Sequence, residues 1–265
     1  MKLEVFTFAD PGADTLLVQM ADEHDLEWME SEISHIRRLC PEEDFCLKAV
    51  KVNDWNRDLS PWPADAVFGK ETEFVNGCEP VTVKHACYKF ASVNSKSGCK
   101  TLLRKEGFGD GAGETLQFLL DEVICDAAGR EGGSAKRIFL GGYSLAGLFA
   151  LWAGCRTDRF AGIAAASPSV WFPHFTDYMR DHPVRAGFVY LSLGDREEKT
   201  RNPVMAKVGE AIREAEHILT EAGKDCLLEW NKGNHFREPD LRTAKAFAWL
   251  IRNAAAMEIS GTPLR

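Results

Sequence analysis

Apolar residues along this chain recur with two periods, one typical of β-strands and the other typical of helices. Short apolar runs predict strands at residues 3–8, 15–20, 45–52, 137–140, 162–166, 187–193 and 226–230. Apolar residues spaced three or four positions apart predict helices at residues 25–39, 116–127, 145–155, 204–218 and 238–257. Because strands and helices alternate, we expect a mostly parallel central sheet with helices on both faces.

Two stretches depart from this alternation. Residues 53–63 contain two tryptophans, several charged residues and two prolines, which predict a loop without helix. Residues 70–107 show poor periodicity, with a weak strand or hairpin pattern at 81–93 and a run of basic side chains. We therefore expect a single domain over 1–265 with an inserted excursion at about 70–107. A solvated surface insertion is the favoured interpretation, and a lid, an edge hairpin or a partner-contact arm are the alternatives.

The strand at 137–140 is followed by two glycines, a serine between small residues and an apolar helix. This arrangement predicts a nucleophile elbow, in which the residues two before and two after the serine must be small. Gly142 and Ala146 hold these positions around Ser144, with alanine where glycine is usual. Such a turn exposes the Ser144 hydroxyl at a helix N-terminus, where the backbone N–H of Leu145 can donate to a developing oxyanion. The alternative is an ordinary glycine-rich turn with an unimportant serine.

A serine nucleophile needs a base to take its proton and an acid to orient that base. Where such an elbow is used, the three residues follow in the order serine, acid, histidine. His235 lies between the last predicted strand and the last predicted helix, which is the position expected for the base. The other six histidines lie in polar or helical contexts or in the excursion, at positions 24, 35, 85, 174, 182 and 217.

The acid is expected directly after the strand at 187–193. Three carboxylates follow Gly194 there, and the usual turn places the acid three residues after the glycine that ends the strand. This spacing selects Glu197, with Asp195 as the second choice and Glu198 as the third. Aspartate commonly bonds backbone N–H groups in turns, which is the role we expect for Asp195.

The remaining site residues are predicted from their places in the loops. The second oxyanion donor normally follows an early strand, which selects the backbone N–H of Ala21. The loop at 53–63 follows the end of a strand, where open α/β sheets bind ligands. Its tryptophans either line a substrate pocket or hold the loop against the core. The substrate contacts that we predict are Trp55, Arg57, Asp58, Trp62, Tyr143 and Trp171.

Charge and composition exclude several classes of partner. The net charge of −8 and the lack of a basic stripe argue against nucleic acid, and the charge modestly disfavours a strongly anionic substrate. No apolar run approaches the length of a membrane-spanning helix, and the N-terminal residues have an acid inside their one apolar stretch, unlike a signal peptide. We therefore expect a cytoplasmic protein with no membrane partner.

The eight cysteines lack the spacing of metal ligands, so no metal site is predicted. Cys46, Cys125, Cys155 and Cys226 fall within strand or helix patterns, where a reduced cysteine acts as a small hydrophobic residue. In a cytoplasm we expect reduced thiols. A disulfide among residues 78, 87 and 99 stays open if the protein is exported.

Three segments together resemble the esterase D / enterochelin esterase branch of the α/β-hydrolases: the elbow at 141–150, the acid turn at 194–198 and the Gly-Asn-His turn at 233–235. The resemblance is good over 108–257 and weak over 1–69. It implies the α/β-hydrolase fold and hydrolysis of carboxylic esters with Ser144 as nucleophile and no cofactor. Members act on siderophores, S-formylglutathione or feruloyl esters, so the substrate itself does not carry over. The chain departs from the family at Ala146, at the oxyanion loop, which lacks a His-Gly pair, and in the excursion.

The favoured function is therefore a serine esterase acting on a small-molecule ester through an acyl-enzyme intermediate. An acyltransferase or thioesterase using the same residues is one alternative. A non-catalytic binding protein that kept the hydrolase scaffold is another, because fold does not imply function. The sequence leaves the oligomeric state open.

Overall fold

The computed structural model describes residues 1–65, 107–124 and 135–260, together with the backbone of four short strands between 73 and 105. Its centre is a seven-stranded sheet with the strand order β1-β3-β2-β8-β9-β10-β11. Every neighbouring pair is parallel except β1 and β3, which confirms the mostly parallel sheet. The strands are β1 (Glu4–Ala9), β2 (Thr15–Ala21), β3 (Cys46–Lys51), β8 (Arg137–Tyr143), β9 (Gly162–Ala166), β10 (Phe188–Gly194) and β11 (Asp225–Asn231).

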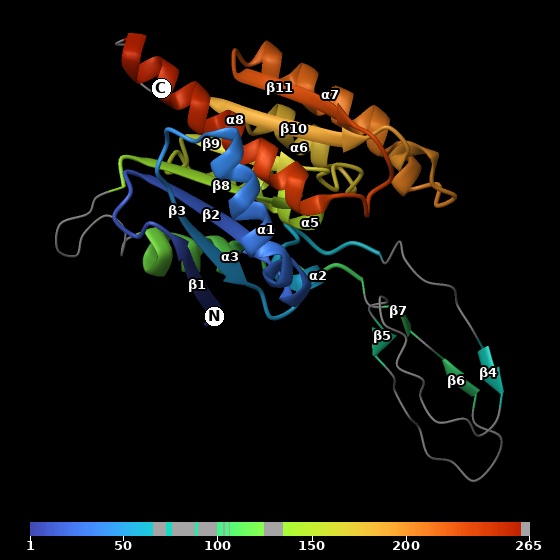
Figure 1. Ribbon diagram of the computed structural model, residues 1–265. Helices are drawn as coiled ribbons and strands as arrows, with labels where there is room; N and C mark the ends of the chain where they lie inside the picture. The colour runs from blue at the N-terminus through green and yellow to red at the C-terminus, as the bar shows by residue number, and fades with distance from the viewer. Residues whose placement is uncertain are drawn as a thin grey trace.

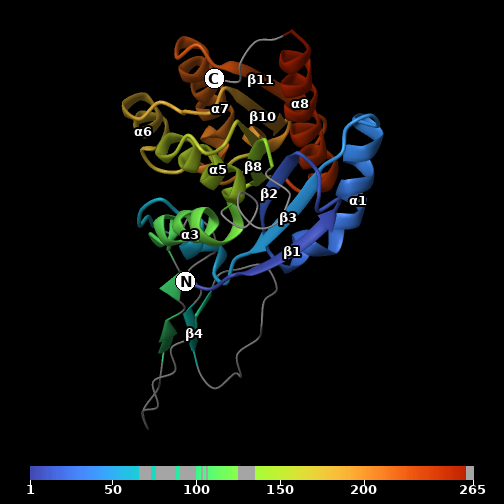
Figure 2. The same ribbon diagram turned by 90° about the vertical axis from the view of Figure 1, so that its left-hand side faces the viewer.

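Helices cover both faces of this sheet, as Figures 1 and 2 show. One face carries α1 (Glu23–Leu39) and α8 (Pro239–Ser260), and the other carries α3 (Ala112–Phe118), α5 (Leu145–Arg156), α6 (Phe175–Asp181) and α7 (Val208–Glu221). Each face has its own buried apolar cluster. Alternation along β2 divides its side chains between them, with Leu17 facing the cluster under α1 and α8 and Leu16 and Val18 facing the other. The predicted α/β layering is therefore confirmed.

The prediction of a helix-free loop at 53–63 is wrong at one point. Residues Trp55–Asp58 form the short helix α2, which Asp54 caps by accepting a hydrogen bond from the Arg57 N–H at 3.0 Å. A four-residue helix is too short to show an apolar period, and both prolines of the segment lie after it. The sequence pattern therefore carried no signal for this helix.

Two predicted helices also differ in detail. After α3 the chain continues as a π-helical turn over Leu119–Ile124, and residues 125–134 lie outside the described part. Before α7, the side chain of Asn202 accepts from the N–H groups of Val204 and Met205, and a short 3₁₀ turn over Met205–Lys207 precedes the helix. The α-helix consequently begins at Val208, later than predicted.

The predicted excursion is described only through four short strands. β4 (Glu73–Val75) pairs with β6 (Lys100–Leu102), and β5 (Tyr88–Lys89) pairs with β7 (Arg104–Lys105), both antiparallel and both separate from the seven-stranded sheet. The rest of 66–106, including most of the predicted strand at 81–93, lies outside the described residues. On either side of this segment, Ala64 and Phe108 exchange two backbone hydrogen bonds of 3.2 and 2.8 Å.

Four cysteines lie in the described part of the chain, and all four are free thiols: Cys40, Cys46, Cys155 and Cys226. Burial raises the pKa of the Cys155 thiol to about 12, as expected of a cysteine that only fills space. The cysteines at 78, 87, 99 and 125 lie outside the described residues. Among the described helices, none combines the length and the apolar character needed to cross a membrane.

Candidate active site

Ser144 lies in the sharp turn between β8 and α5, with φ 58° and ψ −119°. A non-glycine residue in this left-handed region costs about 1–3 kcal/mol, so the surrounding contacts must hold it there. The Ser144 N–H donates to the Ala166 carbonyl at 3.0 Å, and the Ser144 carbonyl accepts from the Ser169 N–H at 3.0 Å. Both partners belong to β9 and the loop after it. The elbow is therefore held in place by the neighbouring strand.

Close packing at the elbow explains the small residues around the serine. A Cβ atom on Gly142 would lie 2.5 Å from the Cβ of Ala146. A Cβ atom on Gly147 would lie 3.0 Å from the Gly142 carbonyl and 3.2 Å from Pro168. Alanine is tolerated at 146 because its methyl group uses the space that the missing side chain of Gly142 leaves open.

The structure brings Ser144, His235 and Glu197 together in one hydrogen-bonded chain. The Ser144 hydroxyl lies 2.9 Å from His235 Nε2, and His235 Nδ1 lies 2.7 Å from Glu197 Oε2. With a carboxylate at Nδ1, the neutral imidazole carries its proton there and leaves Nε2 free to accept from the hydroxyl. The imidazole side chain is 22% exposed and the carboxylate 4% exposed, so the chain runs from a buried acid to an accessible base.

Glu197 reaches this position from the short 3₁₀ turn Glu197–Lys199 after β10. Burial pushes the pKa of its carboxyl upward, but hydrogen bonds from His235, from the Gly194 N–H and from the Ser167 hydroxyl outweigh it, so the pKa lies below its ordinary value. The carboxyl of Glu197 is therefore ionised when it contacts the imidazole.

Gly194 cannot carry a side chain, because a Cβ there would lie 2.4 Å from the Gly233 carbonyl.

The other two candidate carboxylates lie elsewhere. Asp195 Oδ1 accepts from the Gly233 N–H at 2.8 Å, which lowers the pKa of Asp195. Asp195 thus bonds a backbone N–H as predicted, although on the β11–α8 loop and not on its own turn. Glu198 Oε2 faces Arg213, with both N–O distances at 3.3 Å. Of the three, Glu197 alone contacts His235 among the described hydrogen bonds.

The turns that carry the acid and the base are joined through their backbones. The Asp195 N–H donates to the Asn231 carbonyl at 2.8 Å, and the Arg196 N–H donates to the Gly233 carbonyl at 3.1 Å. Gly233 has φ 111°, a conformation that favours glycine. Backbone hydrogen bonds alone therefore hold the loop of His235 against the turn of Glu197.

Several residues of the site were missed by the sequence interpretation. Ser169 is buried, and its hydroxyl lies 3.4 Å from the Ser144 hydroxyl. Ser167 has φ 43° and donates to Glu197 Oε1 at 2.9 Å. Arg242, on α8, donates to the same oxygen at 2.8 Å. The Ser-Pro-Ser segment directly after a predicted strand was a signal that could have identified the two serines. Arg242 gave no such signal, because an arginine inside a helix pattern is normally solvated.

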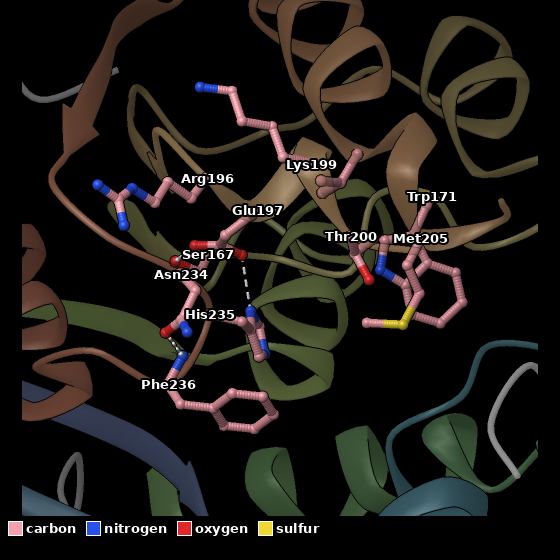
Figure 3. A pocket seen from close by; sticks show the side chains of 11 residues that line it. Ser167, Trp171, Arg196, Glu197, Lys199, Thr200, Met205, Asn234, His235 and Phe236 are labelled. Atoms are coloured by element: carbon pink, nitrogen blue, oxygen red, sulfur yellow. Dashed lines mark hydrogen bonds and ion pairs between the residues drawn. The ribbon is translucent and has the colours of Figure 1, made fainter. Parts of the chain in front are cut away.

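A cavity of about 410 Å³ adjoins His235 and Glu197. Figure 3 shows Trp171 and Met205 side by side on one wall and Phe236 on the other side of the imidazole. Val208 also lines the cavity, and Phe236 is 85% exposed. The lining next to the imidazole is therefore largely apolar and suits an apolar group of a ligand.

Trp171 is the one predicted substrate contact that lines this cavity. Tyr143 is buried beside the site and donates from its hydroxyl to the His235 carbonyl at 2.7 Å. Burial raises the pKa of Tyr143 to about 12, so the phenol keeps the proton that it donates. Tyr143 therefore holds the loop of the base and does not line the cavity.

The predicted contacts in the 53–63 loop are engaged within the protein. Asp58 is 1% exposed, and its carboxylate accepts from the backbone N–H groups of residues 53 and 54 and from Arg57. Arg57 also pairs with Glu114 at 2.9 Å. Trp62 donates to the Pro173 carbonyl at 3.1 Å and packs against aromatic rings of the 172–178 segment, while Trp55 packs against the core. These contacts favour the interpretation that the loop is held against the core over one in which it lines the pocket.

The two predicted oxyanion donors lie at the same edge of the sheet as the serine. Leu145 is the first residue of α5, so its N–H has no acceptor within the helix. Ala21 is the buried last residue of β2, which runs parallel to β8 with Gln19 opposite Gly141. The next residue, Asp22, forms a capping box with Asp25 that fixes the start of α1. The role of Ala21 stays a prediction.

The fold is shared with several solved hydrolase structures. An IroE-like serine hydrolase from Shewanella oneidensis has a TM-score of 0.67 at 15% identity, over 95% of this chain and 76% of its own. The siderophore hydrolase EstA from Aspergillus nidulans has a TM-score of 0.58 at 17% identity, over 95% of both chains. The enterobactin esterase FES from Shigella flexneri has a TM-score of 0.54 at 14% identity, over 94% of this chain and 55% of its own.

No protein-family model and no curated protein sequence matches the chain. At these identities the structural likeness shows the fold. The chain therefore has the α/β-hydrolase fold that the resemblance implies, and it shares this fold with these hydrolases.

Proposed function

We propose that this protein is a serine hydrolase that cleaves carboxylic esters through an acyl-enzyme intermediate. The observation that carries the proposal is the hydrogen-bonded chain from Ser144 through His235 to Glu197. A strained serine within 2.9 Å of an imidazole nitrogen, with that imidazole oriented by a carboxylate, is the arrangement that makes a hydroxyl nucleophilic.

In the proposed reaction the Ser144 oxygen attacks the ester carbonyl while His235 Nε2 takes the hydroxyl proton. Glu197 keeps the proton of the imidazole on Nδ1 and stabilises the imidazolium that forms. His235 then gives the proton to the leaving alcohol, and the acyl group stays on Ser144. With the alcohol gone, a water molecule attacks the acyl-enzyme while His235 Nε2 takes its proton, and the imidazolium returns that proton to the Ser144 oxygen as the carboxylic acid leaves.

The oxyanion of each tetrahedral intermediate needs donors that are in place beforehand. The Leu145 N–H is the donor at the helix end, and we assign the second to the Ala21 N–H on the adjacent strand. The substrate is a small-molecule ester, and the cavity beside His235 holds an apolar part of it against Trp171 and Met205. Two of the similar structures are a siderophore hydrolase and an enterobactin esterase, which makes siderophore esters one class to include among the candidates.

Labelling with a fluorophosphonate probe tests the proposal directly. An activated serine reacts with the probe, so the wild-type protein should be labelled and Ser144→Ala should not. Ser169→Ala is the matched control, because its serine lies close by and labelling at Ser144 should persist. Turnover of p-nitrophenyl esters of increasing chain length, with aromatic and catechol esters beside them, should then disappear in Ser144→Ala. Equal labelling or turnover in Ser144→Ala would remove the mechanism.

His235→Ala completes the test, since members of a triad act as a unit and their effects do not add. We expect the single variant to be almost as inactive as Ser144→Ala and the double variant to be no worse than either. Additive losses would place the base elsewhere. Thioester substrates and alcohol acceptors in the same assay distinguish ester hydrolysis from thioester hydrolysis and acyl transfer. A folded wild-type protein that binds these compounds and turns none over would be a binding protein.

A further inference from the structure

Arg242 is a buried arginine in the first turn of α8, where its side chain is 1% exposed. Its Nη1 atom lies 2.8 Å from Glu197 Oε1 and 3.2 Å from the Ser167 hydroxyl. The same carboxylate oxygen accepts from the Gly194 N–H at 2.7 Å. The Ser167 hydroxyl also donates to Oε1, at 2.9 Å, so three donors occupy this oxygen and Oε2 is left for His235. The two carboxylate oxygens of Glu197 therefore have different partners: Oε1 is held by the protein around it, and Oε2 contacts the imidazole.

The other terminal nitrogen of Arg242 binds the loop that carries the base. Arg242 Nη2 donates to the carbonyls of Lys232 at 3.2 Å and Asn234 at 3.1 Å. Nη1 also donates to the Tyr143 hydroxyl at 3.1 Å, and that hydroxyl donates to the His235 carbonyl. One guanidinium group thus contacts the acid and three points around the base, on turns that follow two different strands.

This position is unfavourable for an arginine unless other contacts compensate. The N-terminal end of a helix carries partial positive charge, which repels a cation in the first turn. Burying a charge is costly unless it is paired and hydrogen-bonded. The Nε of Arg242 has no partner among the described residues, so even this network leaves one donor unused. Such a residue stabilises the fold less than an apolar side chain of similar size would.

We propose that Arg242 is a positioning residue that fixes the imidazole of His235 against Oε2 of Glu197 by binding the acid turn and the base loop together. The inference rests on the proposed function, in which Glu197 and His235 are acid and base. The planar guanidinium has donors with fixed directions on both terminal nitrogens, so it can bind a carboxylate on one side and carbonyl oxygens on the other. A lysine has one ammonium group and cannot span both.

The test compares Arg242→Gln and Arg242→Lys with the wild-type protein. Steady-state kinetics on p-nitrophenyl butyrate should show kcat reduced on the order of 10²-fold in Arg242→Gln, the scale expected when a catalytic group is misplaced by about 1 Å. KM should change little, because Arg242 does not line the cavity. Arg242→Lys keeps the charge and should lose less. Arg252→Gln, on the exposed side of the same helix, is the matched control and should stay at wild-type activity.

A second readout does not depend on turnover. The proton on His235 Nδ1, bonded to Glu197 at 2.7 Å, should give a low-field proton NMR resonance in the wild-type protein. It should disappear from Arg242→Gln while circular dichroism and thermal unfolding still show a folded protein. If Arg242→Gln does not fold, Arg242→Lys is judged by the same two readouts.

The outcomes separate the two proposals. A folded Arg242 variant that keeps both the resonance and a kcat within about twofold of wild type shows that the inference is wrong. If the wild-type protein hydrolyses no ester, but its resonance is present and is lost in Arg242→Gln, the proposed function fails and the positioning role stands.

Discussion

The methyl group of Ala146 occupies the space that a side chain on Gly142 would need, with only 2.5 Å between the two Cβ positions. The two residues flank Ser144, so any shift that relieves a clash between them moves the nucleophile. Gly142→Ala should therefore lower the free energy of unfolding by about 1–3 kcal/mol, as overpacked sites do, and should reduce kcat on an activated ester. Thermal unfolding and steady-state kinetics measure the two effects.

The matched control exchanges the two side chains. Gly142→Ala combined with Ala146→Gly removes the 2.5 Å contact and leaves 3.1 Å to the backbone carbon of residue 146 as the closest approach. The double variant should recover most of the lost stability and activity. If it is as impaired as Gly142→Ala alone, the space at the elbow is not the cause.

The acid should be identified by three single variants. Glu197→Gln keeps the shape of the side chain but removes the charge that orients His235, and kcat should fall on the scale of ~10⁴ that follows when a triad acid is made neutral. Asp195→Asn should cost little, because an amide oxygen can still accept from the Gly233 N–H. Glu198→Gln should be close to silent, since it removes only an exposed pair with Arg213. A larger loss of kcat in Asp195→Asn than in Glu197→Gln would show that the assignment is wrong.

The wall of the cavity should control binding more than chemistry. Trp171→Ala removes an aromatic ring beside His235, and KM for an ester with an apolar acyl chain should rise about 10-fold, equivalent to about 1.4 kcal/mol. The effect on kcat should be smaller. Trp28→Ala, in α1, removes a half-exposed tryptophan that does not line the cavity and should leave both constants unchanged. An unchanged KM in Trp171→Ala would place the substrate elsewhere.

Glu32 should make stability depend on pH. Burial raises the pKa of this carboxyl well above 4.5, and the neighbouring charges of Asp25 and Asp240 add to the effect, against one hydrogen bond from Gln19 at 3.0 Å. The folded protein therefore holds a proton that the unfolded chain releases, so the free energy of unfolding falls as pH rises from about 4.5 through the folded pKa.

Glu32→Gln is neutral at every pH and should remove this dependence. Its melting temperature should exceed that of the wild-type protein at pH 8 and approach it at pH 4. Glu30→Gln, on the exposed side of the same helix, is the control and should leave the slope unchanged. Parallel pH profiles for wild type and Glu32→Gln would show that the buried carboxyl is already ionised.

The segment between residues 66 and 106 should be removable. Ala64 and Phe108 are held together by two backbone hydrogen bonds, so a short Gly-Ser linker can join the chain after deletion of residues 72–105. Shortening a surface loop changes its closure entropy only slowly, at about 0.6 kcal/mol for each halving. We expect a cooperative thermal transition and a labelled Ser144. An aggregated or molten product would show that the segment belongs to the core.

Much of this structure could be predicted from local patterns. Each strand of the sheet is an apolar run, and the elbow, the acid turn and the base loop follow strands in an order that the chain itself displays. The spacing after Gly194 favours Glu197 over Asp195 as the partner of His235, and the structure has this contact. These features depend on a few neighbouring residues, so the sequence is enough to identify them.

What could not be predicted depends on contacts between distant segments. Arg242 lies in an amphipathic helix pattern, where an arginine is normally solvated, and its burial depends on partners 45 and 99 residues away. Asp58 is a charged loop residue by pattern, yet it is buried, and its backbone carbonyl accepts from the hydroxyl of Thr115, 57 residues away. The cavity beside His235 joins residues from the segments after β9, β10 and β11 and from the start of α7, and no local signal marks them as neighbours.

The backbone bonds between the two turns after β10 and β11 have a consequence for how such a protein can diversify. The bonds from Asp195 to Asn231 and from Arg196 to Gly233 use main-chain atoms, so apart from the glycine that φ 111° favours at 233 they do not depend on which side chains the turns carry. Exposed residues on these turns that face the cavity, such as Lys199 and Phe236, can therefore be exchanged without displacing the acid or the base. A lineage built on this scaffold can change what it recognises by single substitutions at the rim while it inherits the chemistry intact.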